Sequence, residues 1–319
     1  MLLSKLDSIS SLVGNTQVLR IDTHKEIDIF AKLEFNGLSN SIKDRAAYNI
    51  LYQGILNGKI TRDSTIVESS SGNLAVSLAA MCQFLGIRFI PVIDKNINRF
   101  YETKLAMYCE QVIKITERDH TGGYLLNRLA KVEQLLGEIP GSVWTNQYEN
   151  EHNRQAYYDH MAPEIISEFE ELDYLFVACS TGGTITGLST RLKAHYPNLK
   201  VIAVDIEGST IFTTSDKKRF VSGLGASLRT KHFDSARIDD YIIVSHQDII
   251  DGCHRLRADQ AIMAGASSGA NYSAIGKYIE RREISPRDKV LFLVHDSGEA
   301  YIDTIYNKQW AADLPALMK

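Results

Sequence analysis

The sequence lacks the cysteine pairs on which a disulfide framework or a zinc site depends. Its four cysteines, Cys82, Cys109, Cys179 and Cys253, lie far apart and form no C-x-x-C pair. It also lacks the unbroken run of about 20 apolar residues that a transmembrane helix requires. The apolar run in its opening "MLLSKLDSIS" is too short for a signal peptide. These absences predict a cytoplasmic protein with reduced thiols and no membrane partner.

The sequence has no basic cluster, and its formal net charge is -4. Nucleic-acid binding needs lysine and arginine gathered on one face, so we expect small-molecule partners and no nucleic acid. His120, His152 and His160 have no carboxylate or cysteine at metal-ligand spacing. We therefore predict no metal site.

Length and patterning predict an α/β protein with two domains. A chain of 319 residues exceeds what one hydrophobic core usually sustains. Segments rich in β-branched residues alternate with segments of helical periodicity, which indicates mostly parallel, twisted sheets flanked by helices. Strands are predicted at residues 28–33, 64–68, 87–93, 111–115, 173–178, 200–205, 241–244 and 289–294, and helices at 73–86, 125–138 and 267–282.

One lysine, Lys43, opens a helical pattern in "SNSIKDRAAYN", residues 39–49. The positive end of a helix dipole disfavours a protonated amine at such a place. Lys43 is therefore either a surface residue of no consequence or an amine whose neutral form is used in chemistry.

A glycine-rich turn, "STGGTITG" at residues 180–187, lies between a predicted strand and a helical segment. Glycines let backbone N–H groups close around an anion, and the helix adds its positive end. The turn fits neither the nucleoside triphosphate loop nor the G-x-G-x-x-G dinucleotide pattern. We interpret it as a phosphate site, with a plain turn of small residues as the alternative. The candidate phosphate ligands are Ser180, Thr181, Gly182, Gly183 and Thr184.

Two further turns open predicted helices with hydroxyl groups. In "SSSGNLA", residues 69–75, Ser70 and Ser71 suit a carboxylate, and the Asn73 amide can donate to a phenolate-like oxygen. In "AGASSGAN", residues 264–271, Ser267 is placed to meet a ring nitrogen. The alternative for both turns is that their serines only cap the helices.

An amine, a phosphate site and a carboxylate turn together describe a site for a phosphorylated aldehyde that handles an amino acid. Pyridoxal 5'-phosphate is such a cofactor, and a Schiff-base lysine must be able to lose its proton. Lys43 is the candidate for that lysine.

The order and spacing of these motifs resemble those of the fold-type II pyridoxal-phosphate enzymes, the cysteine synthase and cystathionine β-synthase superfamily. The likeness runs through "LVGNTQVLRI", "AKLEFNGLSNSIKDRAA", "ESSSGNLAVSLA", "TNQYEN", "STGGTITG" and "AGASSGA". It implies a two-domain fold like that of the tryptophan synthase β chain, and a homodimer. It also implies that Lys43 forms the Schiff base and moves protons. By the same resemblance, Asn73 binds the 3'-hydroxyl of the cofactor, residues 180–184 its phosphate, and Ser267 its pyridine nitrogen.

The middle of the chain resembles one branch of the superfamily, the N-(2-amino-2-carboxyethyl)-L-glutamate synthases. The similar segments are "HTGGYLLNRLAKVEQLL" and "WTNQYENEHN". Enzymes of this branch take O-phospho-L-serine, expel phosphate to leave an aminoacrylate and add L-glutamate, a step towards 2,3-diaminopropionate for siderophores and antibiotics. The resemblance implies that Arg128 grips the phosphate and that Gln147 and Tyr148 lie at the substrate. The alternatives are a solvated arginine on an amphipathic helix and a core tyrosine.

The leading hypothesis is thus a transferase that performs β-replacement in amino-acid biosynthesis. The alternatives are a cysteine synthase-like sulfhydrylase that uses O-acetylserine or O-phosphoserine, and a catalytically silent, cofactor-binding regulatory protein. We expect a larger phosphate-binding domain from residues 1–39 and 153–319. We expect a smaller, mobile domain, residues 40–152, to carry Lys43 and the carboxylate turn.

Several residues depart from the family pattern. Gln17 and Gly37 replace prolines, which predicts a change of loop stiffness, and Leu74 replaces a threonine that many cysteine synthases carry. His295 and Asp296 replace a proline-led turn and are predicted to be structural. Cys179 follows an apolar run and is predicted to be a buried thiol.

Overall fold

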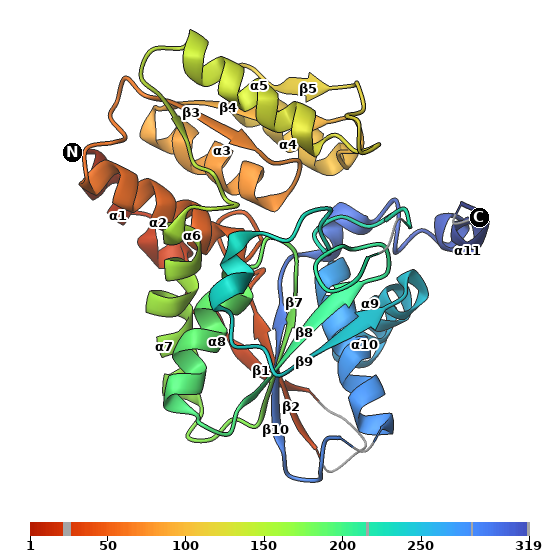
Figure 1. Cartoon of the computed structure of the whole chain (residues 1–319). Helices are drawn as coiled ribbons and strands as arrows, with labels where there is room; N and C mark the ends of the chain where they lie inside the picture. Colours follow the sequence, from red (N-terminus) through yellow and green to blue (C-terminus); the bar gives the residue numbers. More distant parts are fainter. Residues whose placement is uncertain (22–26, 215–216, 282, 318–319) are drawn as a thin grey trace. The chain divides into compact units, whose positions relative to one another are not determined.

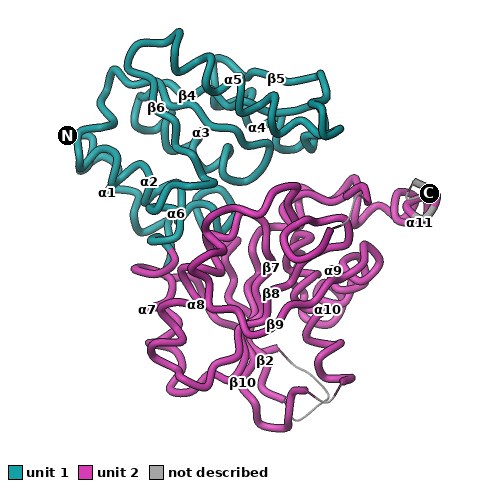
Figure 2. The backbone as a smooth tube through the Cα atoms, viewed as in Figure 1, with its two compact units in different colours: residues 1–14, 37–156 teal, residues 15–36, 157–319 magenta. Residues whose placement is uncertain are grey.

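The structure is a computed structural model that describes residues 1–21, 27–214, 217–281 and 283–317. The chain forms two compact units (Figure 2). Unit 1 comprises residues 1–14 and 37–156, and unit 2 comprises residues 15–36 and 157–319. Each unit is therefore built from two separate stretches of the chain.

Unit 1 contains a four-stranded parallel sheet. Its strands are β3 (Thr65–Ser69), β4 (Arg88–Asp94), β5 (Ile113–Ile115) and β6 (Ser142–Trp144), and its helices are α1 (Leu2–Asp7), η1 (Ser10–Leu12), α2 (Lys43–Leu56), α3 (Asn73–Leu85), α4 (Arg99–Tyr108), α5 (Leu125–Glu138) and α6 (Glu151–Gln155). The strand order is β5-β4-β3-β6. Right-handed connections place α3 and α4 on one face and α5 on the other, because the chain advances from β3 to β5 and then returns to β6 at the opposite edge (Figure 1).

One hydrophobic cluster of unit 1 lies between α5 and the sheet. Five buried side chains form it: Val67, Ile90, Val92, Val132 and Leu135. The periodicity of residues 125–138 predicted this helix with its observed limits, because every third or fourth residue of α5 faces the strands. This packing fixes one face of α5 and thereby the direction in which its other side chains point.

Unit 2 contains a six-stranded sheet in the order β1-β2-β10-β7-β8-β9, and only the β1–β2 pair is antiparallel among the described strands. Its strands are β1 (Val18–Ile21), β2 (Asp28–Leu33), β7 (Tyr174–Ala178), β8 (Lys200–Ile206), β9 (Asp240–Val244) and β10 (Lys289–Val294), and its helices are η2 (Ala156–Met161, whose first residue ends unit 1), α7 (Ala162–Glu168), α8 (Gly183–His195), η3 (Lys231–Ser235), α9 (His246–Gln260), α10 (Ala266–Glu280), η4 (Gly298–Tyr301) and α11 (Lys308–Leu317). Helix α8 covers one face, and α10, backed by α9, covers the other (Figure 1).

The predicted fold class, mostly parallel sheets flanked by helices, is confirmed. Residues 28–33, 125–138 and 289–294 form elements with the predicted limits, and the other predicted strands differ by one or two residues at one or both ends. The helix predicted at 267–282 is α10; its last predicted residue, Arg282, lies outside the described residues. Strands β1 and β6 escaped prediction because they are short and only partly buried. No helix in the described ranges has the length and apolar character needed to cross a membrane.

Candidate active site

Lys43 is the first residue of α2, and hydrogen bonds fix the loop before it. The Asp44 carboxylate accepts from the Ser39 backbone N–H at 2.8 Å and from the Ser39 hydroxyl. That hydroxyl also lies 2.8 Å from the hydroxyl of Ser77 on α3. A Cβ atom at Gly37 would lie 2.9 Å from Asp44 Oδ2, so the close approach of this carboxylate favours glycine there. The start of α2 is thereby tied to α3.

Residues 69–73, which we call the serine turn, join β3 to α3. Gly72 is the N-cap of α3, and no side chain caps this helix. The interpretation of these serines as caps is therefore wrong. The Ser71 hydroxyl instead donates to Asp94 Oδ2 at 3.1 Å, and Ser70 is buried. Asn73 is the first residue of α3, at the end where the helix presents its backbone N–H groups.

The guanidinium of Arg128 reaches the serine turn from α5. Its Nη1 donates to Ser71 Oγ at 3.2 Å, and its Nε lies 3.3 Å from Asp94 Oδ2. The side chain of Arg128 is only 13% exposed. The interpretation of Arg128 as a solvated arginine is therefore wrong.

Gln147 and Tyr148 both contact the end of β3. The Gln147 Nε2 and the Tyr148 hydroxyl donate to the carbonyl oxygen of Ser69 at 3.1 and 3.3 Å. Burial raises the pKa of Tyr148, although the charge of Arg128 opposes this effect. The phenol therefore stays protonated at neutral pH and keeps a proton to donate. Unit 1 thus brings five sequence-predicted residues together: Ser70, Ser71, Arg128, Gln147 and Tyr148.

Glu68 joins β3 to the segment that carries Gln147. Its Oε2 accepts from the Thr145 hydroxyl at 2.6 Å and from the Gln147 backbone N–H at 3.2 Å. Its side chain is fully buried, and this burial raises the pKa of its carboxyl although the donors around it lower it. Sequence reasoning missed Glu68 and Asp94. The available signal was a charged residue at the carboxyl end of an apolar strand.

Residues 180–184, which we call the glycine turn, join β7 to α8 in unit 2. Gly182 is the N-cap of α8 and has φ +86°, a left-handed conformation that favours glycine. A Cβ atom there would lie 2.7 Å from the Phe233 ring. The Thr230 hydroxyl donates to the Thr181 carbonyl oxygen at 2.6 Å, and the Ser180 hydroxyl donates to the Gly225 carbonyl oxygen at 3.1 Å. Hydrogen bonds from hydroxyl groups to backbone carbonyl oxygens thus hold the turn in shape.

Ser267 is the second residue of α10, but Gly265 is the N-cap of that helix and no side chain caps it. The capping interpretation is wrong here too, because the Ser267 hydroxyl donates to the Gly223 carbonyl oxygen at 3.0 Å. Asp296 Oδ2 accepts from the Tyr301 hydroxyl at 3.0 Å, and the His295 backbone N–H donates to the hydroxyl of a serine on α10 at 3.0 Å. These contacts fix the start of α10.

Cys179, next to the glycine turn, is a free and buried thiol, as predicted. Burial raises the pKa of this thiol well above its usual value, so the thiolate that a nucleophile needs is disfavoured. Among the described residues, no three His, Cys, Asp or Glu side chains converge as a metal ion would require.

Comparison with known proteins decides the family. A family model described as "Pyridoxal-phosphate dependent enzyme" matches residues 9–296. The chain belongs to this family. Among curated proteins it is 37% identical over 313 residues to an N-(2-amino-2-carboxyethyl)-L-glutamate synthase of Ralstonia nicotianae, covering 97% of this chain and 92% of the relative. It is 36% identical over 315 residues to the enzyme of the same name from Cupriavidus metallidurans, again covering 97% and 92%.

Solved structures agree with the fold-type II assignment of this pyridoxal-phosphate-dependent enzyme. An O-acetylserine-dependent cystathionine β-synthase from Helicobacter pylori superposes with a TM-score of 0.86 at 25% identity, covering 94% of this chain and 98% of that chain. A hydrogen sulfide-producing enzyme from Fusobacterium nucleatum gives a TM-score of 0.85 at 26% identity, with coverages of 92% and 99%.

The glycine turn fits the phosphate of this cofactor on physical grounds. The left-handed Gly182, which the Phe233 ring leaves no room to enlarge, lets the chain turn directly into α8. The first N–H groups of that helix carry its positive end and need acceptors, which phosphate oxygens provide. The residues present thus suit pyridoxal 5'-phosphate as the cofactor.

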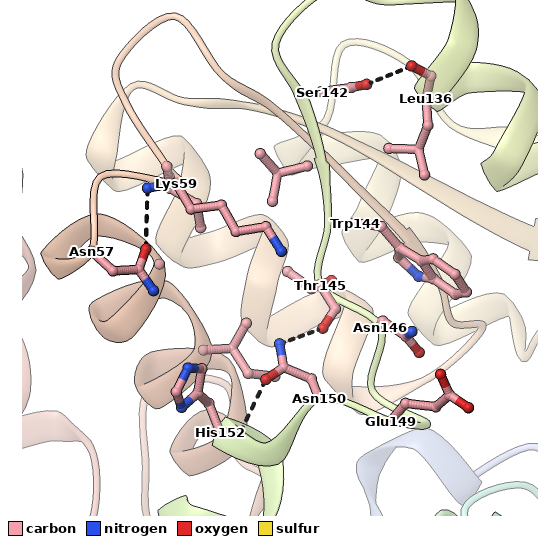
Figure 3. Close-up of a pocket in the computed structure, with 14 residues that line it drawn as sticks. Asn57, Lys59, Leu136, Ser142, Trp144, Thr145, Asn146, Glu149, Asn150 and His152 are labelled. Atoms are coloured by element: carbon pink, nitrogen blue, oxygen red, sulfur yellow. Dashed lines mark hydrogen bonds between the residues drawn. The ribbon is translucent and has the colours of Figure 1, made fainter.

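A separate cavity of about 540 Å³ lies within unit 1 and holds none of the predicted site residues. Figure 3 shows the Lys59 side chain, which lines the cavity, extending towards Thr145 and Asn150. The Asn150 side chain donates to the Thr145 carbonyl oxygen at 2.8 Å. The cavity therefore adjoins the segment that carries Gln147 and Tyr148, but neither of these two residues lines it.

Proposed function

We propose that this enzyme joins O-phospho-L-serine and L-glutamate to give N-(2-amino-2-carboxyethyl)-L-glutamate and phosphate. In this β-replacement the Cβ–O bond of phosphoserine breaks, phosphate leaves with the bonding electrons, and the glutamate amine forms a new bond to Cβ and loses a proton. The observation that carries the proposal is the similarity at 36–37% identity to two enzymes of that name, over 97% of the chain.

The proposal assigns each contact of the cofactor to a residue of this chain. Lys43 is its Schiff-base lysine, Asn73 binds its 3'-hydroxyl, the glycine turn binds its phosphate, and Ser267 meets its pyridine nitrogen. When bound, pyridoxal phosphate withdraws electrons from Cα of the amino acid and so makes the α-proton acidic. The Lys43 amine removes that proton and later returns one to Cα. A serine at the ring nitrogen leaves it uncharged, which suits elimination at Cβ.

The proposal assigns the amino-acid substrate to unit 1. Ser70, Ser71 and Gln147 bind its carboxylate, and Arg128 and Tyr148 bind its phosphate group. Two features support the phosphate assignment. The Arg128 guanidinium is buried at the serine turn, where its charge is screened little by solvent. The raised pKa of Tyr148 keeps its hydroxyl a donor to phosphate oxygens.

A product assay tests the proposed reaction. The holoenzyme is incubated with O-phospho-L-serine and either L-glutamate or sulfide, and the amino-acid product is identified by mass while phosphate release is counted. We expect the glutamate adduct with one phosphate per product, and no product from Lys43→Ala. Lys5→Ala, a change of an exposed lysine in the same unit, is the matched control. Product with sulfide alone would indicate a sulfhydrylase, and turnover with neither would indicate a cofactor-binding regulatory protein.

The resemblance supports further parts of the proposal. We propose a cytoplasmic homodimer that acts in the synthesis of 2,3-diaminopropionate for a siderophore or an antibiotic. Sedimentation of the purified holoenzyme tests the dimer, because a monomer at micromolar concentration would exclude it. Loss of diaminopropionate from cells that lack the gene would place the enzyme in that synthesis.

A further inference from the structure

Asp94 is a buried carboxylate that the proposed reaction does not use. It is the last residue of β4, whose neighbour β3 leads into the serine turn, and its side chain is 12% exposed. A carboxylate at this depth needs partners for both oxygens, because the burial of an uncompensated charge is costly.

Asp94 has those partners, and they define its orientation. The Asn96 backbone N–H donates to Oδ1 at 2.9 Å. The Ser71 hydroxyl donates to Oδ2 at 3.1 Å, while the backbone N–H of Asp94 donates back to Ser71 Oγ at 3.0 Å. The carboxylate is therefore fixed before any substrate arrives.

Arg128 completes a closed triangle with these two residues. Its Nε lies 3.3 Å from Asp94 Oδ2, and its Nη1 donates to Ser71 Oγ at 3.2 Å. A guanidinium is planar and its five N–H groups point in fixed directions. Arg128 Nε makes no hydrogen bond among the described residues, so the Nη1 hydrogen bond to Ser71 and the charge attraction of Asp94 at 3.3 Å together set the direction of the group, including the N–H bonds available to a ligand.

We propose that Asp94 is a positioning residue that fixes the Arg128 guanidinium for the phosphate group of the substrate. This inference rests on the proposed function, because it presupposes that Arg128 binds that phosphate. Asp94 also balances the charge of Arg128 in the free enzyme, so that the buried arginine neither turns away nor needs solvent.

Steady-state kinetics with a double-mutant cycle test the proposal. The variants are Asp94→Asn, Arg128→Ala and both together, with Asp63→Asn, a change of an exposed aspartate in unit 1, as the matched control. For Asp94→Asn we expect the KM for O-phospho-L-serine and the inhibition constant of inorganic phosphate each to rise about tenfold. We expect kcat to change less than about threefold and the KM for L-glutamate to stay unchanged, whereas a merely structural defect would lower kcat and raise both KM values. In the Arg128→Ala background, Asp94→Asn should have no further effect.

The outcomes separate this inference from the function on which it rests. If Arg128→Ala raises the KM for O-phospho-L-serine and Asp94→Asn does not, the inference alone is overturned. Independent, additive effects of the two substitutions would also overturn it. If Arg128→Ala leaves that KM unchanged, or if the wild-type holoenzyme does not turn over the two substrates, the assignment of Arg128 fails and the inference fails with it. Thermal melting of each variant shows whether Asp94→Asn is folded.

Discussion

The serine turn of unit 1 and the glycine turn of unit 2 both lead from a strand into a helix, but different groups hold the two turns in shape. Each follows a buried parallel strand, and each enters a helix whose N-cap is a glycine without a side-chain cap. Their surroundings differ. Charged and polar side chains hold the serine turn, namely Glu68, Asp94, Arg128, Gln147 and Tyr148. The glycine turn is held by hydroxyl groups on backbone carbonyls and by the absence of a side chain at Gly182.

This difference separates what each turn can recognise. A turn held by side chains can change its ligand when a single residue changes, because each side chain brings its own charge and donors. A turn held by its backbone presents N–H groups in a geometry that few substitutions alter. The first arrangement suits an amino-acid substrate that varies between related enzymes, and the second suits the phosphate of a shared cofactor.

The largest expected effect comes from giving a side chain to Gly182 in the glycine turn. In Gly182→Ala the new Cβ would lie 2.7 Å from the Phe233 ring, at a φ of +86° that alanine rarely adopts. We expect a loss of about 3 kcal/mol in the free energy of unfolding and release of the cofactor. Urea unfolding and the absorbance of the cofactor retained after gel filtration measure the two effects.

Gly72→Ala is the matched change in the serine turn. A Cβ atom there meets nothing within 4 Å, and the backbone is extended. We expect the stability of this variant to stay within about 0.5 kcal/mol of the wild type. Equal losses from the two substitutions would contradict the contrast between the turns.

The next largest loss of stability is expected from substitution of Glu68, whose carboxylate holds the segment that carries Gln147. Glu68→Ala leaves the Thr145 hydroxyl and the Gln147 backbone N–H buried without their acceptor. Such orphaned donors cost about 2 kcal/mol together. We therefore expect a lower urea midpoint and weaker binding of the substrate carboxylate, measured as a raised KM for O-phospho-L-serine. Glu68→Gln keeps an acceptor oxygen and should lose less than half as much; an equal loss would show that the charge, rather than the hydrogen bonds, matters.

The sequence predicted both turns, but it did not predict the long-range side-chain contacts that hold the serine turn. Glycine and serine clusters after apolar strands are local signals, and the strand and helix periods flanking them are equally local, so positions such as 28–33 and 125–138 were found with their limits. The contacts that hold the serine turn join residues far apart in the chain: Glu68 meets Thr145, and Ser71 meets Asp94 and Arg128. No period or spacing encodes such pairs. A local capping rule predicts that the serines cap both helices, but nearby glycines, Gly72 and Gly265, occupy the N-cap positions.

Two aspartates, Asp94 in the sheet of unit 1 and Asp205 in the sheet of unit 2, extend the contrast to pH dependence. Asp94 is paired with Arg128, whereas burial raises the pKa of Asp205, near the end of β8, from 3.8 to about 6. The folded state thus holds the Asp205 proton more tightly than the unfolded state. The resulting stability is fully present below about pH 4 and is lost as the pH rises through about 6.

Asp205→Asn should therefore stabilise the protein above pH 6, because the neutral amide imitates the protonated acid. We expect a gain of about 1.5 kcal/mol at pH 8, half of what the full pKa shift would give, and no gain at pH 4. Thermal unfolding of both proteins across this range measures the difference. Asp94→Asn should lose stability at pH 8, since it breaks an ion pair; a gain there would remove the distinction between the two carboxylates.

The smallest loss of stability that we expect to be measurable comes from removing the Thr230 hydroxyl, which bonds to the glycine turn. Thr230→Val keeps the shape of a buried side chain but removes the 2.6 Å hydrogen bond to the Thr181 carbonyl oxygen. We expect a loss of about 1 kcal/mol in unfolding free energy and a several-fold rise in the dissociation constant of the cofactor, with the KM for O-phospho-L-serine unchanged. Thr190→Val, in α8, removes a hydroxyl that donates, among the described residues, to carbonyl oxygens of its own helix, and it should leave cofactor binding as it is. If Thr230→Val raised the KM for O-phospho-L-serine instead, the glycine turn would shape the substrate site. The assignment of the substrate to the serine turn and of the cofactor phosphate to the glycine turn would then be wrong.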